Sequence, residues 1–333
     1  MKEDTGKFIV SLDFELLWGM RDIETAESYG SNILGVWETL PTTLELFKKY
    51  SVKATFATVG FLFASTKEEL LSYCPEEKPS YLDKNLSPYN GHLDLVKANE
   101  TEDKFHFATE LIELIKKYPG QEIATHTFSH YYCLEKGQTK EDFRKDILAA
   151  IEIAKKWNIE LKSLVFPRNQ FNDEYLKIIQ ELGISSYRGN GKEWFNTATS
   201  ANEEKLIKRA FRLLDTYINL SRHDGYTLEE IAAKKPFDIP SSRFLRPYTP
   251  KLKRLEGLRL NRILNNMTRA AKKGRIFHLW WHPHNFGSDQ KENFEFLTRI
   301  LIHYKELNKK YGFESQTMLE LSNKLEDLST ANI

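Results

Sequence analysis

Short apolar runs alternate with longer amphipathic segments along most of this chain. Runs at about 8–13, 54–59, 122–126, 161–166, 184–187 and 276–281 have the length of strands. Helical spacing is found in a segment that ends at Tyr50 and at about 102–118, 140–157, 173–182 and 291–311. Strands that are separated by helices pair in parallel, and about six or seven such units can close a barrel. We therefore expect an α/β barrel of parallel strands.

The composition fits one large globular domain. The chain has 333 residues, of which 41% are hydrophobic and 29% are charged. It contains no sequence repeat and no low-complexity linker. We expect residues 1–333 to form a single domain with a basic helical insertion at about 243–275.

The charge of the chain is unevenly distributed. The formal net charge of +1 gives no indication of nucleic-acid binding, but residues 243–275 contain eleven basic side chains and one acidic side chain, Glu256. Either the helix at about 251–273 is simply amphipathic with solvated cations, or its cations meet a diphosphate-bearing or acidic substrate or anionic lipid headgroups. Arg246 would then contact the substrate. The inward side chains of the amphipathic alternative are Leu252, Leu255, Ile263, Leu264 and Met267.

The two cysteines and the start of the chain indicate a cytoplasmic protein. Cys74 and Cys133 stand alone, without the spacing of a disulfide framework or a zinc ribbon. The first residues lack a signal-peptide pattern, and no apolar run reaches the length of a membrane span. We expect at most peripheral membrane contact.

Chemically active side chains follow the ends of the predicted strands. Asp13 and Glu15, His126, Arg168 and His282 each lie at or just after such an end. In a parallel barrel these ends meet at one rim, where reactive side chains collect. The sequence therefore predicts one functional site at that rim.

The histidines indicate a metal. Five of the nine lie in two short segments, His126 with His130 and His278 with His282 and His284. Two imidazoles four residues apart on a helical turn can bind one ion, although such a pair taken alone more often has no metal. Asp13 and Glu15 point to the same side of a strand and supply a third ligand and a second carboxylate. A metal that activates water beside a carboxylate base makes a hydrolytic site.

Four ordered motifs resemble those of the polysaccharide deacetylase family, whose members share the NodB homology domain and form carbohydrate esterase family four. They are Ser11-Leu12-Asp13-Phe14-Glu15, residues 54–60, residues 122–130 and His282-Pro283. The resemblance extends from about Phe8 to about Leu321. It implies a distorted (β/α) barrel of about seven parallel strands that hydrolyses an N-acetyl group from an amino sugar. It also implies one divalent metal ion, usually Zn²⁺, with Co²⁺, Ni²⁺, Mn²⁺ or Fe²⁺ as alternatives.

The resemblance also implies roles at the metal. His126 and His130 match the metal histidines of the family, Glu15 matches the metal carboxylate and Asp13 matches the catalytic base. The family has an Asp at the metal position, and Glu15 departs from it in residue type and in spacing. Exchanged roles for Asp13 and Glu15 therefore stay open.

Other motifs match the family less closely. His282 resembles the last motif and is our expected general acid, with His284 as the alternative and His278 as a core residue. Arg168 resembles the arginine that orients the base, although the usual Arg-x-Pro order is reversed. The fourth motif, an Asp that tunes the late histidine, has no clean match, and Asp215 is the candidate.

Several tryptophans lie beside these motifs. Sugar rings stack on such side chains, although a single tryptophan is more often a core residue. Trp18, Trp194 and Trp280 are expected to bind substrate, and Trp281 also lies in this segment.

These features predict a metal-dependent hydrolase that removes an N-acetyl group from an amino sugar. A cytoplasmic enzyme would meet its sugar in nucleotide- or lipid-diphosphate-linked form, on the route to a surface polysaccharide such as an O-antigen or capsule. One alternative is a metal hydrolase of another C–N bond, such as a formamide or a ring amide. The other is a catalytically silent carbohydrate-binding barrel, which the imperfect motifs favour.

Overall fold

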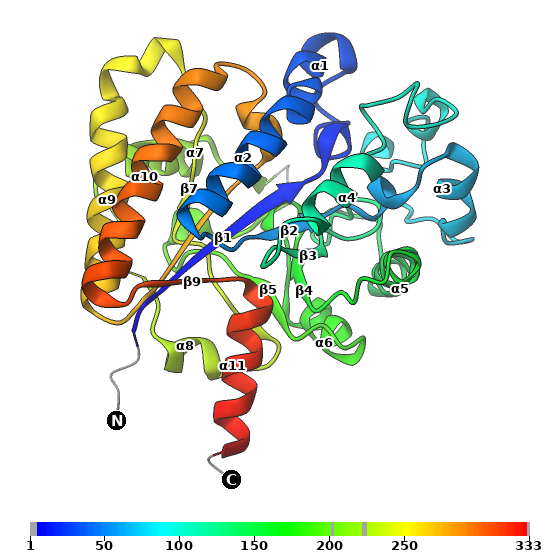
Figure 1. Cartoon of the computed structure of the whole chain (residues 1–333). Coiled ribbons are helices and arrows are strands. Elements are labelled where there is room, and N and C mark those ends of the chain that lie inside the picture. Colours follow the sequence, from blue (N-terminus) through cyan, green and yellow to red (C-terminus); the bar gives the residue numbers. More distant parts are fainter. Residues whose placement is uncertain (1–4, 201–202, 222–224, 332–333) are drawn as a thin grey trace.

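The fold is built around one parallel sheet. The computed structural model describes residues 5–200, 203–221 and 225–331, and its strands run in the order β6-β5-β4-β3-β2-β1-β8-β7, with β9 beside β1 (Figure 1). Every strand pair in it is parallel. The strands are β1 (Lys7–Phe14), β2 (Thr55–Thr58), β3 (Glu122–Thr125), β4 (Ser163–Val165), β5 (Ser186–Arg188), β6 (Phe237–Asp238), β7 (Arg243–Phe244), β8 (Ile276–Trp281) and β9 (Glu314–Gln316).

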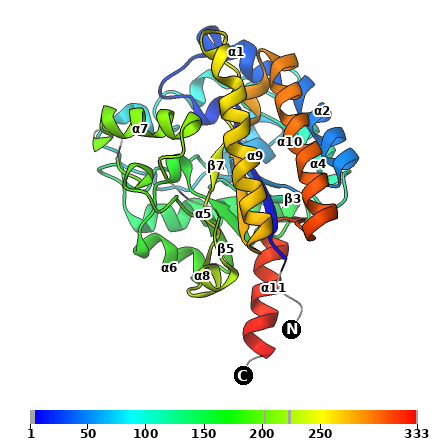
Figure 2. The ribbon, with the colours of Figure 1, turned by 90° about the vertical axis from the view of Figure 1, so that its left-hand side faces the viewer.

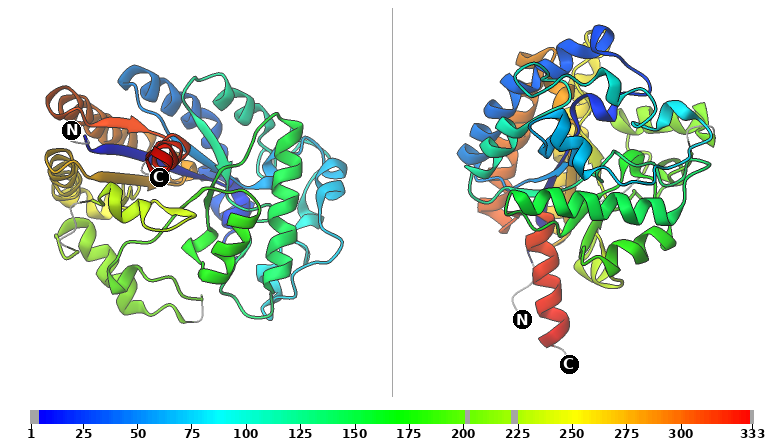
Figure 3. Two further views of the ribbon diagram at one scale, coloured as in Figure 1. Left: turned by 90° about the horizontal axis from the view of Figure 1, so that it is seen from below. Right: turned by 90° about the vertical axis from the view of Figure 1, so that its right-hand side faces the viewer.

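The sheet curls into a distorted barrel. Its two outermost strands, β6 and β7, come from one short stretch of chain, so the sheet bends back on itself (Figure 3). The predicted (β/α) barrel of parallel strands is therefore confirmed. The strands that sequence periodicity did not predict are β6, β7 and β9, which are only two or three residues long.

Helices cover the outside of the sheet and join its strands (Figures 1 and 2). The predicted helices that end at Tyr50 or extend over about 140–157, 173–182 and 291–311 are present in the structure. The helices are α1 (Ala26–Leu34), α2 (Val36–Tyr50), α3 (Lys67–Tyr73), α4 (Thr109–Lys116), α5 (Lys140–Lys156), α6 (Asp173–Glu181), α7 (Leu206–Tyr217), α8 (Leu228–Ala232), α9 (Glu256–Lys272), α10 (Gln290–Tyr311) and α11 (Met318–Ala331). In the part of the chain that the structure describes, none of them is long and apolar enough to cross a bilayer.

Two predicted helices differ from the structure. The helix expected at about 102–118 is present only as α4, because the Asp103 carboxylate accepts hydrogen bonds from the backbone N–H groups of Lys97 and Phe105 and holds the preceding segment in turns. The segment 243–275 begins with β7, which pairs with β8, and continues into α9, which packs against α10 (Figure 2). It is therefore part of the barrel, not an insertion.

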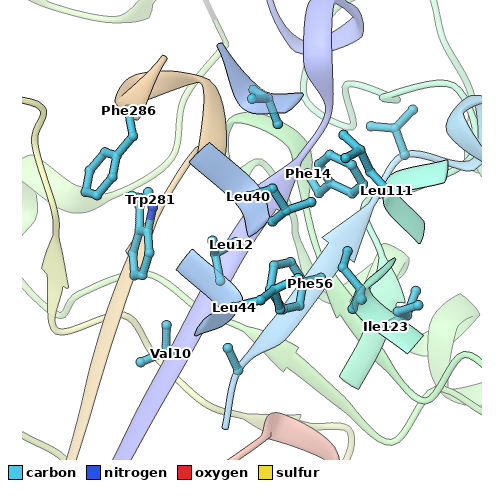
Figure 4. Close-up of a cluster of buried hydrophobic side chains, with 14 of the residues drawn as sticks. Val10, Leu12, Phe14, Leu40, Leu44, Phe56, Leu111, Ile123, Trp281 and Phe286 are labelled. Carbon is cyan, nitrogen blue, oxygen red and sulfur yellow. The ribbon is translucent and has the colours of Figure 1, made fainter. Parts of the chain in front are cut away.

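Alternation along β1 separates the outer core from the barrel interior. Phe8, Val10, Leu12 and Phe14 pack outward in the main hydrophobic cluster, together with side chains of α2 and β2 such as Leu40, Leu44 and Phe56 (Figure 4). The odd-numbered residues face the other way, and Ile9 belongs to a second cluster inside the barrel. Asp13 shares this inner face, so the pattern of β1 points its carboxylate into the barrel.

The register of the sheet brings strand ends to one level. Asp13 pairs with Ala57 in β2, Thr58 pairs with Thr125 in β3, and Leu12 pairs with Trp281 in β8. The residues that follow these positions are therefore neighbours at the carboxyl rim of the barrel. The rim predicted from the sequence is confirmed.

A buried carboxylate on α5 holds the loop after β3. This loop is not the helical turn expected for His126 and His130, because Thr127 and His130 have φ angles of 64° and 55° in the left-handed region. Asp146 accepts hydrogen bonds from the backbone N–H groups of Phe128 and Ser129 at 2.7 and 3.1 Å. Burial raises the pKa of Asp146 to about 6, so its carboxylate is ionised above neutral pH. The loop conformation thus depends on one charged acceptor.

Replacing that acceptor tests this dependence. Asp146→Asn puts an amide N–H₂ group against one of the two backbone N–H donors, and we expect the free energy of unfolding to fall by about 1–3 kcal/mol. Denaturant unfolding slightly above neutral pH measures it. Glu141→Gln, on the exposed face of the same helix, is the control and should change the value by less than about 0.5 kcal/mol. Equal unfolding midpoints for Asp146→Asn and wild type would contradict the role of Asp146.

Candidate metal and hydrolytic site

Glu15, His126 and His130 bring three ligand atoms together at the rim. These atoms lie within 4.8 Å of one another. Oε2 of Glu15 lies 3.0 Å from Nε2 of His130 and 3.2 Å from Nε2 of His126. All three side chains are buried. The three residues therefore form a cluster that could hold a metal ion.

The contacts of His126 fit such an ion. Its Nδ1 lies 2.7 Å from the carbonyl oxygen of Val165, which can only accept, so Nδ1 carries the proton. In the neutral ring, Nε2 then presents a lone pair to the carboxylate of Glu15. Two acceptors would face each other unless a cation, either a proton or a metal ion, lies between them. Two imidazole nitrogens and one carboxylate oxygen are a donor set that suits zinc and similar divalent ions.

Arg21 contacts the Nδ1 atom of His130, on the side of the ring away from Glu15. Nη1 of Arg21 lies 3.2 Å from Nδ1 of His130 and also donates to the carbonyl of Trp18 at 2.6 Å. Because a guanidinium only donates, Nδ1 of His130 accepts, and its Nε2 proton is donated to Glu15. Burial lowers the pKa of His130 to about 4, so the ring is neutral at physiological pH. A metal ion at Nε2 would displace that proton.

Neighbouring charges and contacts lower the pKa of Glu15 by more than burial raises it. Burial alone would raise the pKa of this carboxyl, but the charge of His282 and the contacts with His126 and His130 lower the pKa well below its usual range. The side chain is therefore ionised and available as a ligand.

Asp13 is clamped by a buried arginine from β5. Nη1 and Nη2 of Arg188 lie 2.6 and 2.7 Å from the two carboxylate oxygens of Asp13, and the guanidinium also donates to Ser11 and Asn169. Arg188 is fully buried, and its Cζ lies 4.0 Å from the ring centroid of Trp280. Burial alone would raise the pKa of Asp13, but Arg188 and then His126 and His282 hold the pKa below its usual range.

The expected partner of Asp13 was Arg168, and this prediction was wrong. Arg168 has a φ of 53° after β4, and its guanidinium pairs with Asp22, lies 3.7 Å from Glu135 and stacks on Tyr132. The left-handed turn directs its side chain away from Asp13. Arg188 directly follows a predicted strand, so the rule that reactive residues follow strand ends would have selected it. Arg168 was selected instead because it resembles the arginine motif of the family.

His282 lies near both carboxylates. Its Nε2 is 3.7 Å from both Oδ2 of Asp13 and Oε1 of Glu15, and its Nδ1 lies 3.3 Å from Oδ1 of Asn285. The side chain is 24% exposed, so it can meet a ligand. Asn285 follows the motif by three residues and went unnoticed in the sequence.

The other two late histidines are buried. His284 stacks on His282, and its Nδ1 is 3.9 Å from Glu15 and has no hydrogen-bond partner among the described residues. His278 contacts Ser11 and the carbonyl of Ile239, as a core residue would. Burial lowers the pKa of both rings to about 3, so they are neutral.

The structure places Asp215 away from the histidines. It lies on α7, where its carboxylate pairs with Arg243 and Arg262 and caps the backbone N–H groups of residues 220 and 221. Among its contacts within the described part of the chain, none is with His282. The expectation that Asp215 tunes His282 is therefore wrong, and Asn285 occupies that position.

The tryptophans divide between core and surface. Trp18 is fully buried and donates to the carbonyl of His106, and Trp281 packs between Phe47 and Phe286, so neither can meet a sugar. The expectation for Trp18 was wrong because the strand-end acids are followed by a turn that points its ring into the core. Trp194 is 52% exposed on the surface. Trp280 lies between Arg188 and His282, with its ring 5.6 Å from the latter.

A cleft of about 620 Å³ opens beside the site. Its wall includes Asn169, Phe244 and Trp280, which contact Arg188 or His282, and it includes Arg246 of the basic segment. This volume is in the range of pockets for small ligands.

Comparison with known proteins supports the family that the sequence motifs indicate. The model of the polysaccharide deacetylase family matches residues 35–187, which contain His126 and His130 but neither Asp13 nor His282. No curated protein matches the sequence.

Solved structures share the fold at low identity. A Mycobacterium smegmatis protein named as a polysaccharide deacetylase has a TM-score of 0.60 and 14% identity, over 98% of this chain and 92% of that chain. A Pseudomonas aeruginosa PAO1 protein named likewise has a TM-score of 0.53 and 10% identity, over 95% and 89%. The 4-alpha-glucanotransferase of Thermococcus litoralis has a TM-score of 0.53 and 14% identity, over 96% of this chain and 40% of that chain, so the likeness by itself shows only the fold. The ordered motifs, the family-model match over residues 35–187 and the barrel together support the polysaccharide deacetylase family, whose members share the NodB homology domain.

Proposed function

We propose that this protein is a metal-dependent hydrolase that removes the N-acetyl group of an amino sugar. The observation that carries the proposal is the convergence of Glu15, His126 and His130 on one point, beside the clamped carboxylate of Asp13 and the half-buried His282. A hydrolytic site for an amide needs an activated water, a base and an acid within reach of one bond.

Glu15, His126 and His130 would hold the metal, for which we propose zinc. When bound, such an ion supplies Lewis acidity to the amide carbonyl and to a water molecule. Asp13 is the proposed base, because Glu15 occupies the position between the two histidines. Arg188 keeps Asp13 ionised and fixes the direction of its oxygens.

His282 is the proposed general acid. It lies 3.7 Å from both carboxylates, it is the most exposed of the three late histidines, and the contact with Asn285 leaves its Nε2 facing the site. From there it can protonate the leaving amine. His284 is buried and neutral, so it is better suited to support His282 by stacking.

The cellular setting is part of the proposal. The two cysteines are unpaired thiols, which suits the reducing cytoplasm. A cytoplasmic deacetylase of this kind would act on a precursor of a surface polysaccharide. Measuring acetate against formate release from N-acetyl and N-formyl amino sugars separates this activity from hydrolysis of another C–N bond.

Metal loading tests the ligand set. Metal-free wild-type protein should bind one Zn²⁺ or Co²⁺ per chain by calorimetric titration, and His126→Ala should lose this binding because one imidazole ligand is gone. Activity should disappear with chelation and return with added metal. His303→Ala, which removes a histidine on the outer helix α10, is the control and should bind as wild type. Stoichiometric binding that survives in His126→Ala would contradict the site.

Two substitutions separate the base from the carboxylate ligand. Asp13→Asn should keep the metal and lower kcat by about 10²- to 10⁴-fold, because an amide cannot accept the proton. Glu15→Gln should instead weaken metal binding. Metal content and acetate release are the measurements, and the opposite pattern would exchange the two roles.

Lysine substitutions distinguish the roles of Arg188 and Arg168. Arg188→Lys replaces a two-pronged clamp by one ammonium group, and we expect kcat to fall by about 10- to 100-fold with metal content unchanged. Arg168→Lys alters a partly exposed pair and should change kcat by less than about fivefold, with a free N-acetylated amino sugar as the substrate of both variants. A larger loss in Arg168→Lys than in Arg188→Lys would restore Arg168 as the residue that orients Asp13.

A further inference from the structure

The cleft beside the site is lined by arginines from α7 and from the segment between β7 and α9. Figure 2 shows β7 between α7 and α9, and the described residues of these elements pack together. The six arginines are Arg209, Arg212, Arg243, Arg246, Arg259 and Arg262. The sequence alternative in which the cations of α9 are all solvated is therefore wrong, because Arg259 and Arg262 are buried and face the cleft.

Carboxylates compensate only part of this charge. Asp215 pairs with both Arg243 and Arg262, Glu204 pairs with Arg212, and Glu256 pairs with Arg259. Three acids thus serve four arginines. Burial, and after it the charge of Arg243, lowers the pKa of Arg262 to about 10.

Arg246 and Arg209 have no counter-ion among the residues that the structure describes. Arg246 is half-buried, and burial lowers its pKa below the ordinary value for a guanidinium. Arg259 also has a buried Nε that finds no hydrogen-bond partner within the described part of the chain. Leaving a half-buried guanidinium without a counter-ion costs free energy, so Arg246, with the exposed Arg209 in the same cleft, is suited to an anion that the described residues do not provide.

We propose that the cleft binds the phosphate or diphosphate group of a carrier-linked N-acylated amino sugar. This inference rests on the proposed function and names its substrate class. Guanidinium forks match phosphate oxygens in geometry and charge, whereas a neutral polymer of N-acetylated sugars would supply no counter-ion for Arg209 and Arg246. The cleft also presents neutral polar groups for a sugar, including Asn190, Ser241 and Ser242.

The position of the cleft fits a substrate that spans both regions. Asn169 lies in its wall and accepts from Arg188, which holds Asp13. Trp280 lies in the same wall, beside His282. An amino sugar at the carboxylates could therefore stack on Trp280 while its phosphate reaches the arginines.

Helix α7 favours a lipid carrier over a nucleotide. One face of the helix lines the cleft through Arg209, Arg212 and Thr216. Apolar residues at helical spacing follow its other face, and they are exposed: Leu206 is 78%, Ile207 54%, Leu213 37% and Leu214 48% exposed. A hydrocarbon chain or membrane surface would cover this face. The nucleotide-linked sugar carries the same diphosphate chemistry, so both sources enter the test.

Binding is tested first on the metal-free protein, because pyrophosphate chelates divalent ions. Calorimetric titration with inorganic pyrophosphate should give saturable binding to wild type, and Arg246→Ala should weaken it by about 10- to 100-fold. Arg254→Ala, an exposed arginine of the same segment outside the cleft, is the matched control and should bind as wild type. No saturable binding, or equal binding by Arg246→Ala, would overturn the proposal.

Turnover then identifies the carrier. The metal-loaded protein is given the same N-acetylated hexosamine in three forms: free, linked to uridine diphosphate, and linked to polyprenyl diphosphate in vesicles. We expect a diphosphate-linked form to exceed the free sugar at least about tenfold in kcat/KM, with this preference reduced in Arg246→Ala and kept in Arg254→Ala. Preference for the polyprenyl form assigns a lipid carrier, and preference for the uridine form assigns a nucleotide.

The outcomes separate this inference from the proposed function. Equal hydrolysis of the free and linked sugars overturns the carrier inference and leaves the deacetylase standing. Pyrophosphate binding that depends on Arg246, without acetate release from any form, supports the anion cleft and overturns the deacetylase.

Discussion

Two carboxylates are buried at the end of the central strand, and each must have positive charge beside it. Asp13 has the two-pronged contact of Arg188, itself fully buried. Glu15 has two imidazoles, one of which faces it with a lone pair because its other nitrogen donates to a backbone carbonyl. The charge of Asp13 is thus balanced by a side chain of the protein, whereas the contact between Glu15 and His126 requires a cation. This difference is the reason for proposing Asp13 as the base and Glu15 as the metal ligand.

The sheet makes this burial possible. Its parallel register aligns the ends of β1, β3 and β8, so that residues far apart in sequence meet at one rim. Period-two alternation along β1 directs Asp13 inward while its neighbours fill the outer core. The loop that carries His126 and His130 is then fixed by Asp146 on α5, in a backbone conformation that a helical turn could not provide.

The sequence was sufficient for the barrel, because six strands and most helices have clear periodicity, and for the residues whose place follows from a strand end, such as Asp13, His126 and His282. It was insufficient where a side chain acts from outside the motif. Arg188 follows a predicted strand end but lies outside the motifs, Asn285 reaches the site through a turn, and Arg168 is turned away by one left-handed residue. The arginine cleft combines α7 with α9, and no local pattern reports a contact between helices so far apart in the chain. Likewise, the sequence of α9 does not show which of its basic side chains are buried.

The central claim is that the charge missing beside Glu15 is a metal ion. Anomalous diffraction at the zinc edge, from crystals of zinc-loaded protein, tests it directly. The account predicts one strong peak between Glu15, His126 and His130, at about 2.0–2.2 Å from each ligand atom, with Asp13 still bound to Arg188. A peak elsewhere, or no peak there with Nε2 of His126 still in contact with Glu15, would show that a proton supplies the charge and would contradict the account.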